Sequence, residues 1–284
     1  MKVLSLYCGA GGIDEGLKQS GIKTTLAIDS WKDACETFKA NHPDCEVIHG
    51  NVSDYIESIN QADTIVGGPP CPEFSRANAV RTFDACEVNN FWKVVDKLNP
   101  KYYLMENVQD VIKVCNRSNY LLECSDYGVA QCRIRRIFSN IPKPEPQKQK
   151  TMIAEVVNTE YDYFTDVSFP NRNQKCVSRT LSEQCPTLTT MDCFYWTPIP
   201  IMTRKYLQEK DKIWIDKTTK TNLTNGMKCK KISNMDRQLL QGFPETYQFI
   251  GKDDSVRKQI CNAVPPPVIK SIFEQVSYLE VIAQ

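Results

Sequence analysis

The first 140 residues of the chain alternate between short apolar runs and stretches with helical spacing. The apolar runs predict β-strands at residues 3–7, 24–28, 46–48, 64–66 and 102–105. Helical spacing predicts helices between them, at residues 13–19, 32–41 and 88–98. This alternation predicts an α/β fold with an open, mostly parallel sheet, in which ligands bind at the carboxyl ends of the strands.

The second half of the chain has a weaker periodicity. Residues 142–150 are rich in proline and charge, which is typical of a linker or an exposed loop. Short strand-like pieces and turns follow up to about residue 232, and helical spacing returns at residues 234–241 and 267–276. The chain therefore changes its architecture after its first 150 residues.

The composition narrows the class of protein. Hydrophobic residues make up 41% of the 284 positions, no apolar run is long enough to span a membrane, and the first residues lack the features of a signal peptide. We therefore expect an intracellular protein, in the cytoplasm or the nucleoid or nucleus, that is not secreted and has no membrane partner. Thirteen cysteines without a CxxC pair, and only two histidines, argue against a disulfide framework, a metal site and a Ser-His-Asp hydrolase. Catalysis is expected to use Cys, Asp, Glu or Arg.

Charge is distributed unevenly along the chain. The formal net charge is +1, and residues 1–150 carry 18 basic and 19 acidic side chains. Residues 204–237 instead carry 10 basic and 4 acidic side chains, a local net charge of +6. This segment is either a nucleic-acid contact or a solvated face, and its charge alone does not separate the two.

Three strand ends carry the candidate chemistry. The glycines of residues 8–12 (Cys-Gly-Ala-Gly-Gly) allow a tight turn against a ligand, and Asp29 ends the next strand, where it could bind ribose hydroxyls. A turn without a ligand and a nicotinamide or flavin site remain alternatives for this loop. Prolines on both sides of Cys71 hold its thiol rigidly after the fourth strand. Glu106 follows the fifth strand, and Arg133 and Arg135 share one face if their segment is extended, so that a carboxyl and two cations lie near one cleft.

Six segments resemble the DNA cytosine carbon-5 methyltransferases in their characteristic order, over nearly the whole chain. The segments are residues 7–12 (Tyr-Cys-Gly-Ala-Gly-Gly), 70–71 (Pro-Cys), 106–108 (Glu-Asn-Val), 131–135 (Gln-Cys-Arg-Ile-Arg), 240–244 (Leu-Gln-Gly-Phe-Pro) and 262–266 (Asn-Ala-Val-Pro-Pro). The resemblance implies a Rossmann-like sheet that binds S-adenosylmethionine, with helices on both faces. It also implies a catalytic domain at residues 1–150 and 251–284, and a small, mostly β or irregular target-recognition domain at residues 151–250.

The resemblance also implies a mechanism. A thiolate, here that of Cys71, adds to carbon 6 of a cytosine flipped out of DNA, and carbon 5 then takes the methyl group of S-adenosylmethionine. Glu106 matches the residue that contacts N3 and the exocyclic amine, and donating a proton there requires a raised carboxyl pKa. Arg133 and Arg135 complete the expected catalytic set, and no metal is expected.

The binding residues are likewise implied by the matching positions. The expected cofactor-binding residues are Tyr7, Gly9, Gly11, Gly12, Asp29, Asn51, Val52, Pro70, Asn262 and Val264. The expected nucleic-acid contacts are Ser75 and Arg76 after the Pro-Cys motif and, in the basic segment, Arg204, Lys205, Lys228, Lys230 and Lys231. Double-stranded DNA is the expected partner, with a cognate restriction endonuclease as a further candidate, and the protein is expected to be a monomer.

Two alternatives remain beside DNA cytosine methylation. One branch of the family methylates transfer RNA and carries a Cys-Phe-Thr signature, which residues 185–187 (Cys-Pro-Thr) and 193–195 (Cys-Phe-Tyr) only approach. The other is an inactive relative kept for DNA binding, against which the presence of Cys71 and Glu106 argues. The chain also departs from the family pattern by having Pro72 after the cysteine, Ser30 after the ribose carboxylate, Asn51 in place of aspartate and Cys261 before the final asparagine.

Overall fold

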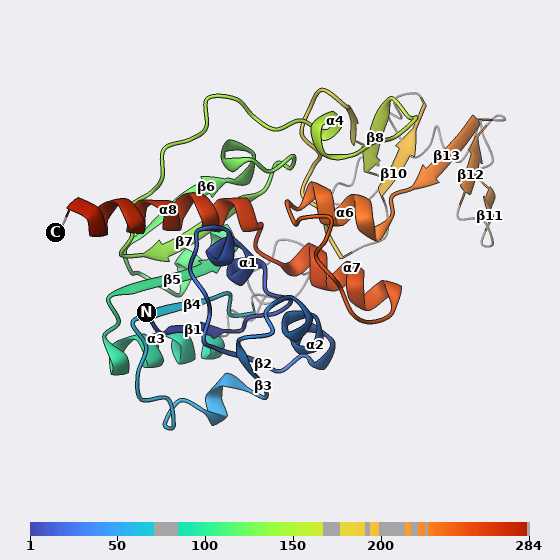
Figure 1. The fold of residues 1–284 in the computed structure, drawn as a ribbon. Helices are drawn as coiled ribbons and strands as arrows, with labels where there is room; N and C mark the ends of the chain where they lie inside the picture. The colour runs from blue at the N-terminus through green and yellow to red at the C-terminus, as the bar shows by residue number, and fades with distance from the viewer. Residues whose placement is uncertain are drawn as a thin grey trace.

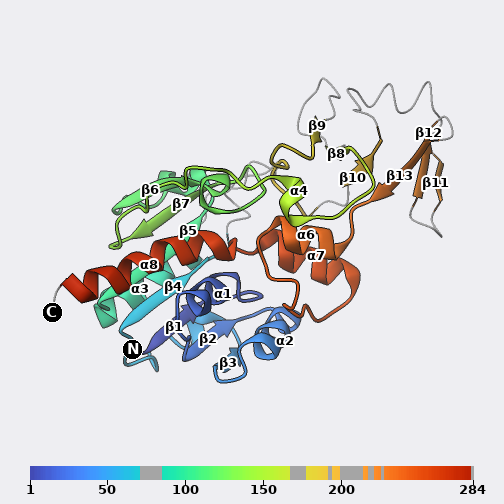
Figure 2. The same ribbon diagram turned by 45° about the horizontal axis from the view of Figure 1, so that its top comes forward.

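The computed structural model describes residues 1–70, 85–166, 177–190, 194–198, 214–216, 221–224 and 227–282. Its larger sheet has seven strands in the order β3-β2-β1-β4-β5-β7-β6 (Figures 1 and 2). These strands are β1 (Val3–Leu6), β2 (Leu26–Asp29), β3 (Glu46–His49), β4 (Thr64–Gly67), β5 (Tyr102–Asn107), β6 (Asn119–Glu123) and β7 (Ile134–Ser139). All five strands expected from the sequence are present.

The larger sheet is parallel over its first five positions and antiparallel at one end. Strands β3, β2, β1, β4 and β5 pair in parallel, and β7 then pairs antiparallel with both β5 and β6. The β6–β7 hairpin was not among the expected strands. It brings Arg135 and Arg136 onto the sheet beside the end of β5, where Glu106 pairs with Ile137 and Asn107 with Arg136.

Helices cover both faces of this sheet, as expected. Alternate strand residues such as Val3 and Val66 pack with α1 and α8, which lie against each other on one face. Leu4 and Ile65 point to the other face and pack with α3. The helices of this part are α1 (Gly12–Gln19), α2 (Lys32–Asn41), α3 (Cys86–Leu98) and α8 (Pro266–Ile282), with 3-10 turns η1 (Val52–Asp54), η2 (Gln109–Lys113) and η3 (Cys124–Tyr127).

A second, separate sheet is antiparallel and has the strand order β11-β12-β13-β10-β8-β9. Its strands are β8 (Tyr163–Asp166), β9 (Val177–Thr180), β10 (Phe194–Thr197), β11 (Trp214–Asp216), β12 (Thr221–Thr224) and β13 (Met227–Lys231). Phe164, Phe194 and Trp196 form its buried aromatic centre. The expected fold class, an α/β sheet with a small β-rich addition, is confirmed.

Helices α4 (Ile153–Val156), α6 (Asn234–Leu240) and α7 (Asp253–Asn262) lie between the two sheets (Figure 1). Ser233 caps α6 by accepting a hydrogen bond from the backbone of Asp236, whose carboxylate also accepts one from the indole of Trp196. This links α6 to the second sheet. Helix α7 was not expected from the sequence, because only Gln259, Ile260 and Cys261 of its residues are buried. No helix in the described part of the chain is long and apolar enough to cross a membrane.

Candidate active site

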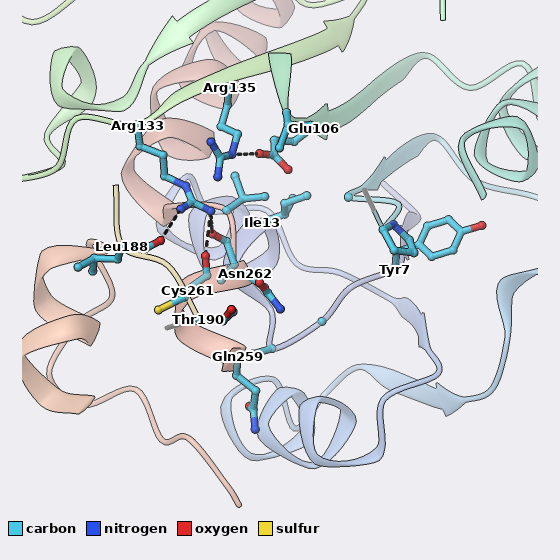
Figure 3. A pocket seen from close by; sticks show the side chains of 18 of the residues that line it. Tyr7, Ile13, Glu106, Arg133, Arg135, Leu188, Thr190, Gln259, Cys261 and Asn262 are labelled. Atoms are coloured by element: carbon cyan, nitrogen blue, oxygen red, sulfur yellow. Dashed lines mark hydrogen bonds and ion pairs between the residues drawn. The ribbon is translucent and has the colours of Figure 1, made fainter. Parts of the chain in front are cut away.

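A cavity of about 890 Å³ lies at the carboxyl ends of the parallel strands, where the sequence pattern places a ligand. Its floor is formed by the loop after β1 and by residues at the ends of β2, β4 and β5. Residues 187–190 and the end of α7 form the opposite wall (Figure 3). These six segments of the chain therefore meet around one space of the size that small-molecule sites occupy.

Glu106 and Arg135 form an ion pair in this cavity. The Nε atom of Arg135 lies 2.9 Å from Oε1 of Glu106, and Glu106 is 8% exposed. Burial raises the pKa of the Glu106 carboxyl, while the charges of Arg135 and Arg133 act in the opposite direction. The carboxyl is thus held in place and binds its proton more tightly than a solvated glutamate does.

Arg133 lies two residues before Arg135 in the sequence and has a different environment. Its guanidinium donates to the backbone oxygens of Leu188 at 3.3 Å and Cys261 at 2.9 Å, and Ala263 O lies at 3.5 Å. The side chain is buried, and this burial lowers its pKa to about 10. Arg133 therefore joins the wall segment 187–190 to the end of α7, and its Nε atom has no partner among the described residues.

The glycine loop after β1 is a left-handed turn. Tyr7, Gly9 and Gly11 have φ angles of 53°, 53° and 82°. The carboxylate of Asp29 accepts hydrogen bonds from the backbone N–H groups of Gly9 at 2.7 Å and Trp31 at 2.8 Å. Burial raises the pKa of Asp29, and these backbone donors oppose the rise. The acidic side chain at the end of β2 is thus fixed against the turn.

The turn also packs closely against the end of the chain that follows α7. A Cβ atom added at Gly12 would lie 2.3 Å from the backbone oxygen of Val264. Glycine is therefore required at position 12 by close approach. The approach brings Asn262 and Val264 to the same cavity as the turn.

Most of the described residues expected at the site do line the cavity. They are Tyr7, Gly9, Gly12, Asp29, Pro70, Glu106, Arg133, Arg135, Asn262 and Val264. Gly11, Asn51 and Val52 do not line it. Val52 is buried in the core beneath the sheet, and the Asn51 amide reaches the carboxylate of Asp54 at 3.5 Å.

Several expected residues lie outside the described residues. These are Cys71, Ser75, Arg76, Arg204 and Lys205. The chain that leads to Cys71 is described up to Pro70, which lines the cavity, and the Asn107 side chain donates to Pro69 O at 3.1 Å. Lys228, Lys230 and Lys231 lie on β13, where Lys230 is exposed, and neither Lys230 nor Lys231 lines the cavity.

The sequence did not identify residues 187–190 as part of the site. Cys185 pairs with Gln131 in a parallel bridge, and Leu188 N donates to the Gln131 side chain at 3.1 Å. The Thr187 hydroxyl donates to Cys132 O at 2.6 Å. In the sequence, residues 185–187 stood out only because they approach the Cys-Phe-Thr signature of the RNA-methylating branch. Trp31 also lines the cavity and was not among the residues expected at the site.

The known proteins to which this chain is similar are methyltransferases. The model of the family described as C-5 cytosine-specific DNA methylase matches residues 1–278. The Type II methyltransferase M1.HphI of Haemophilus parahaemolyticus is 26% identical over 329 aligned positions, which cover 96% of this chain and 86% of that protein. The Type II methyltransferase M.NgoMIV of Neisseria gonorrhoeae is also 26% identical, covering 96% of each chain.

Two solved structures share the fold. One is described as a DNA modification methyltransferase encoded within a prophage (E. coli), with a TM-score of 0.65, 17% identity and 99% of each chain covered. The other is a variant of Spodoptera frugiperda DNMT2, with a TM-score of 0.64, 20% identity, and 100% of this chain and 99% of that chain covered. Both sheets of this protein thus lie within the range of the similarity.

Proposed function

We propose a mechanism for this chain, which belongs to the C-5 cytosine-specific DNA methylase family. In this mechanism Cys71 and Glu106 catalyse the transfer of a methyl group to carbon 5 of a cytosine that is flipped out of double-stranded DNA. The chain is a DNA (cytosine-5-)-methyltransferase, and its cofactor is S-adenosylmethionine. The observation that carries the proposal is the buried Glu106–Arg135 pair, which lies in the cavity that also receives Pro70, the residue before Cys71.

The donor set of the cavity fits the cofactor. A carboxylate at the end of β2 is suited to ribose hydroxyls, and Asp29 occupies that place. The left-handed turn at Gly9 leaves open space at its Cα, since an added Cβ would meet no atom within 4 Å. Asn262 and Val264 add an amide and an apolar side chain from the opposite wall. The bound cofactor supplies an activated methyl group, and these residues hold and orient it.

The proposed covalent step uses Cys71 as the nucleophile. Its thiolate forms a bond to carbon 6 of the cytosine, and the electron pair of the 5,6 double bond moves to carbon 5. Carbon 5 would then take the methyl group of S-adenosylmethionine, which breaks the bond between the methyl carbon and the sulfur and leaves S-adenosylhomocysteine. Loss of the proton from carbon 5 and breakage of the bond between carbon 6 and sulfur restore the ring and the free thiolate.

Glu106 would assist by holding the cytosine at N3 and the exocyclic amine. A carboxyl that donates a proton to N3 must itself be protonated, and burial raises the pKa of Glu106 in that direction. The ion pair with Arg135 fixes the orientation of the carboxyl. Arg133 completes the proposed set as a positioning residue, because its guanidinium is engaged by the backbone of the opposite wall.

The domain roles, the further DNA contacts and the partners are also proposed from membership of this family. Residues 1–150 and 251–284 are proposed as the catalytic domain and residues 151–250 as the target-recognition domain, whose basic strand β13 carries Lys228, Lys230 and Lys231. Ser75, Arg76, Arg204 and Lys205 are proposed as further DNA contacts. The protein is proposed to act as an intracellular monomer, and the Type II names of its relatives support a cognate restriction endonuclease as a partner.

Covalent capture tests this proposal directly. Duplex DNA that contains 5-fluorocytosine cannot lose its substituent at carbon 5, so a covalent complex with the protein should accumulate and survive denaturation. Cys71→Ser should abolish the complex, whereas the control Cys86→Ser, at an exposed cysteine, should retain it. A complex that persists in Cys71→Ser would show that another nucleophile is used.

The nature of the nucleic acid is tested separately. Incubation with tritiated S-adenosylmethionine and either duplex DNA or transfer RNA should place label in DNA. Label that appears only in RNA would overturn the DNA assignment in favour of the RNA-methylating branch of the family.

A further inference from the structure

Tyr247 lies directly beneath the glycine turn of the cofactor site, although it is 237 positions away from it in the sequence. It belongs to the loop between α6 and α7 and is 5% exposed. Its hydroxyl donates a hydrogen bond to the backbone oxygen of Ala10 at 2.5 Å. Ala10 stands between Gly9 and Gly11, so this contact reaches the centre of the turn.

The hydroxyl also sets the space available to the turn. A Cβ added at Gly11 would lie 2.6 Å from the Tyr247 oxygen and 3.1 Å from Nε2 of His42. Gly11 has a φ of 82°, a conformation that favours glycine independently of space. Gly11 therefore contributes to the site by packing on Tyr247, which accounts for its absence from the cavity wall.

Tyr247 is itself held rigidly on both of its ends. The Gln238 side chain donates to its backbone oxygen at 3.1 Å, and the rings of Phe243 and Phe249 lie 4.8 and 5.2 Å from its ring. The neighbouring residue Gln248 exchanges two hydrogen bonds with the Asn41 amide of α2, at 2.8 and 2.9 Å. The phenol thus offers a fixed point from which the turn can be oriented.

We infer that Tyr247 is a positioning residue for S-adenosylmethionine, which acts by holding the Ala10 carbonyl and with it the left-handed turn of residues 9–12. The inference rests on the family's cofactor and not on the proposed role of Cys71. Without the hydroxyl, the unliganded turn samples other conformations, and binding must select the competent one. Cofactor affinity then falls, while turnover at saturating cofactor is retained.

The test compares two tyrosines with the same chemistry. Tyr127 is 1% exposed and donates its hydroxyl to the backbone oxygen of Pro144 at 3.0 Å, and it does not line the cavity. Tyr247→Phe and Tyr127→Phe each delete one buried hydrogen bond from a tyrosine to a carbonyl. Titration calorimetry with S-adenosylhomocysteine should show an affinity about tenfold weaker for Tyr247→Phe, which is the size expected for the loss of one such hydrogen bond. The affinity of Tyr127→Phe should be unchanged.

Kinetics and hydrogen exchange complete the test. In Tyr247→Phe the KM for S-adenosylmethionine should rise with the dissociation constant, and kcat at saturation should stay within about twofold. Amide exchange at residues 9–12 of the unliganded protein should accelerate in Tyr247→Phe and not in Tyr127→Phe. Equal affinities in the wild type and Tyr247→Phe, or equal losses in both variants, would overturn the inference. Because no readout uses the covalent step, a failed adduct experiment would leave this result intact.

Discussion

The two sheets of the molecule differ in how their strands pair and in where they place their polar side chains. The larger sheet is parallel through β5, and its strand ends gather Asp29, Glu106 and the glycine turn on one edge. The smaller sheet is antiparallel, centres on Phe164, Phe194 and Trp196, and has a lysine-rich inner strand, β13. Parallel strands point their carboxyl ends at one place, so they concentrate chemistry, whereas antiparallel strands distribute side chains over a face. The contrast leads us to expect turnover to depend on the first sheet and nucleic-acid affinity on the second.

The largest effect is expected from the core of the second sheet. Trp196 is 1% exposed, packs on Phe164 with ring centroids 5.4 Å apart, and donates its indole N–H to Asp236. Trp196→Ala should lower the free energy of unfolding by about 3–5 kcal/mol, because it leaves a large cavity. Thermal and denaturant unfolding would measure this loss. If the variant still binds S-adenosylhomocysteine at temperatures below its unfolding transition, the two sheets have separate roles. Loss of this binding in the fully folded variant would contradict that separation.

The next effect concerns turnover at the first sheet. Glu106→Gln keeps the size of the side chain and removes its proton chemistry, so kcat should fall by about 100-fold or more. Single-turnover methylation of duplex DNA would measure the fall, and calorimetry should find cofactor affinity unchanged. The control Glu123→Gln alters another cavity-lining carboxyl, one that binds the backbone of Arg133 and Ser125. A comparable loss in the control would show that charge at the cavity, rather than contact with the cytosine, sets the rate.

A pH effect of intermediate size is expected beneath the first sheet. Burial, assisted by the charge of Lys18, lowers the pKa of His42 to about 4 from an ordinary value of 6.5. Between these values the unfolded chain binds a proton that the folded chain does not, so stability is present above pH 6.5 and is lost as pH falls toward 4. His42 should contribute a loss of about 2 kcal/mol between pH 7.5 and pH 5.

Comparison with a variant isolates this contribution. Denaturant unfolding of wild type and His42→Gln across the same pH range should give a shallower decline in the variant. Asp14 is buried with a pKa raised to about 6, so its contribution runs in the opposite sense, and it cancels because both proteins contain it. Parallel curves for the two proteins would contradict the assignment to His42.

The smallest effect is expected at the second sheet's basic strand. Lys230 is exposed on β13, and Lys230→Ala should weaken DNA binding a few-fold and reduce the slope of log affinity against log salt by about one unit. Fluorescence anisotropy at several salt concentrations would measure both quantities. Lys23→Ala offers a control, because Lys23 is exposed beside Asp44 on the first part of the chain. An equal change in the control would mean that net charge, and not β13, governs affinity.

Sequence periodicity could predict the parallel strands because their buried runs are almost wholly apolar. The expected helix at residues 32–41 coincides with α2, and the second strand begins only two residues later than expected. The hairpin of β6 and β7 was missed because Arg135 and Arg136 interrupt its pattern. Their charges are satisfied by the Glu106 carboxylate and by Gln109 O, partners that no local pattern can reveal.

The same limit applies to the site. Residues at strand ends, such as Asp29 and Glu106, could be placed from the topology alone. Contacts between distant segments could not, because nothing near Arg133 in the sequence indicates Leu188 and Cys261 as its acceptors. Tyr247 was missed for the same reason, since its link to Ala10 depends on the path of the loop after α6.

The close packing of Gly12 on Val264 has a consequence for how the protein is made. The turn after β1 leaves the ribosome about 250 residues before its partner wall does. The cofactor pocket therefore cannot close until that wall has been synthesised, and α1 must wait for α8 to cover its apolar side. Contacts between residues so far apart in the sequence favour slow folding. The cofactor can stabilise the folded chain by binding only once synthesis has passed residue 264.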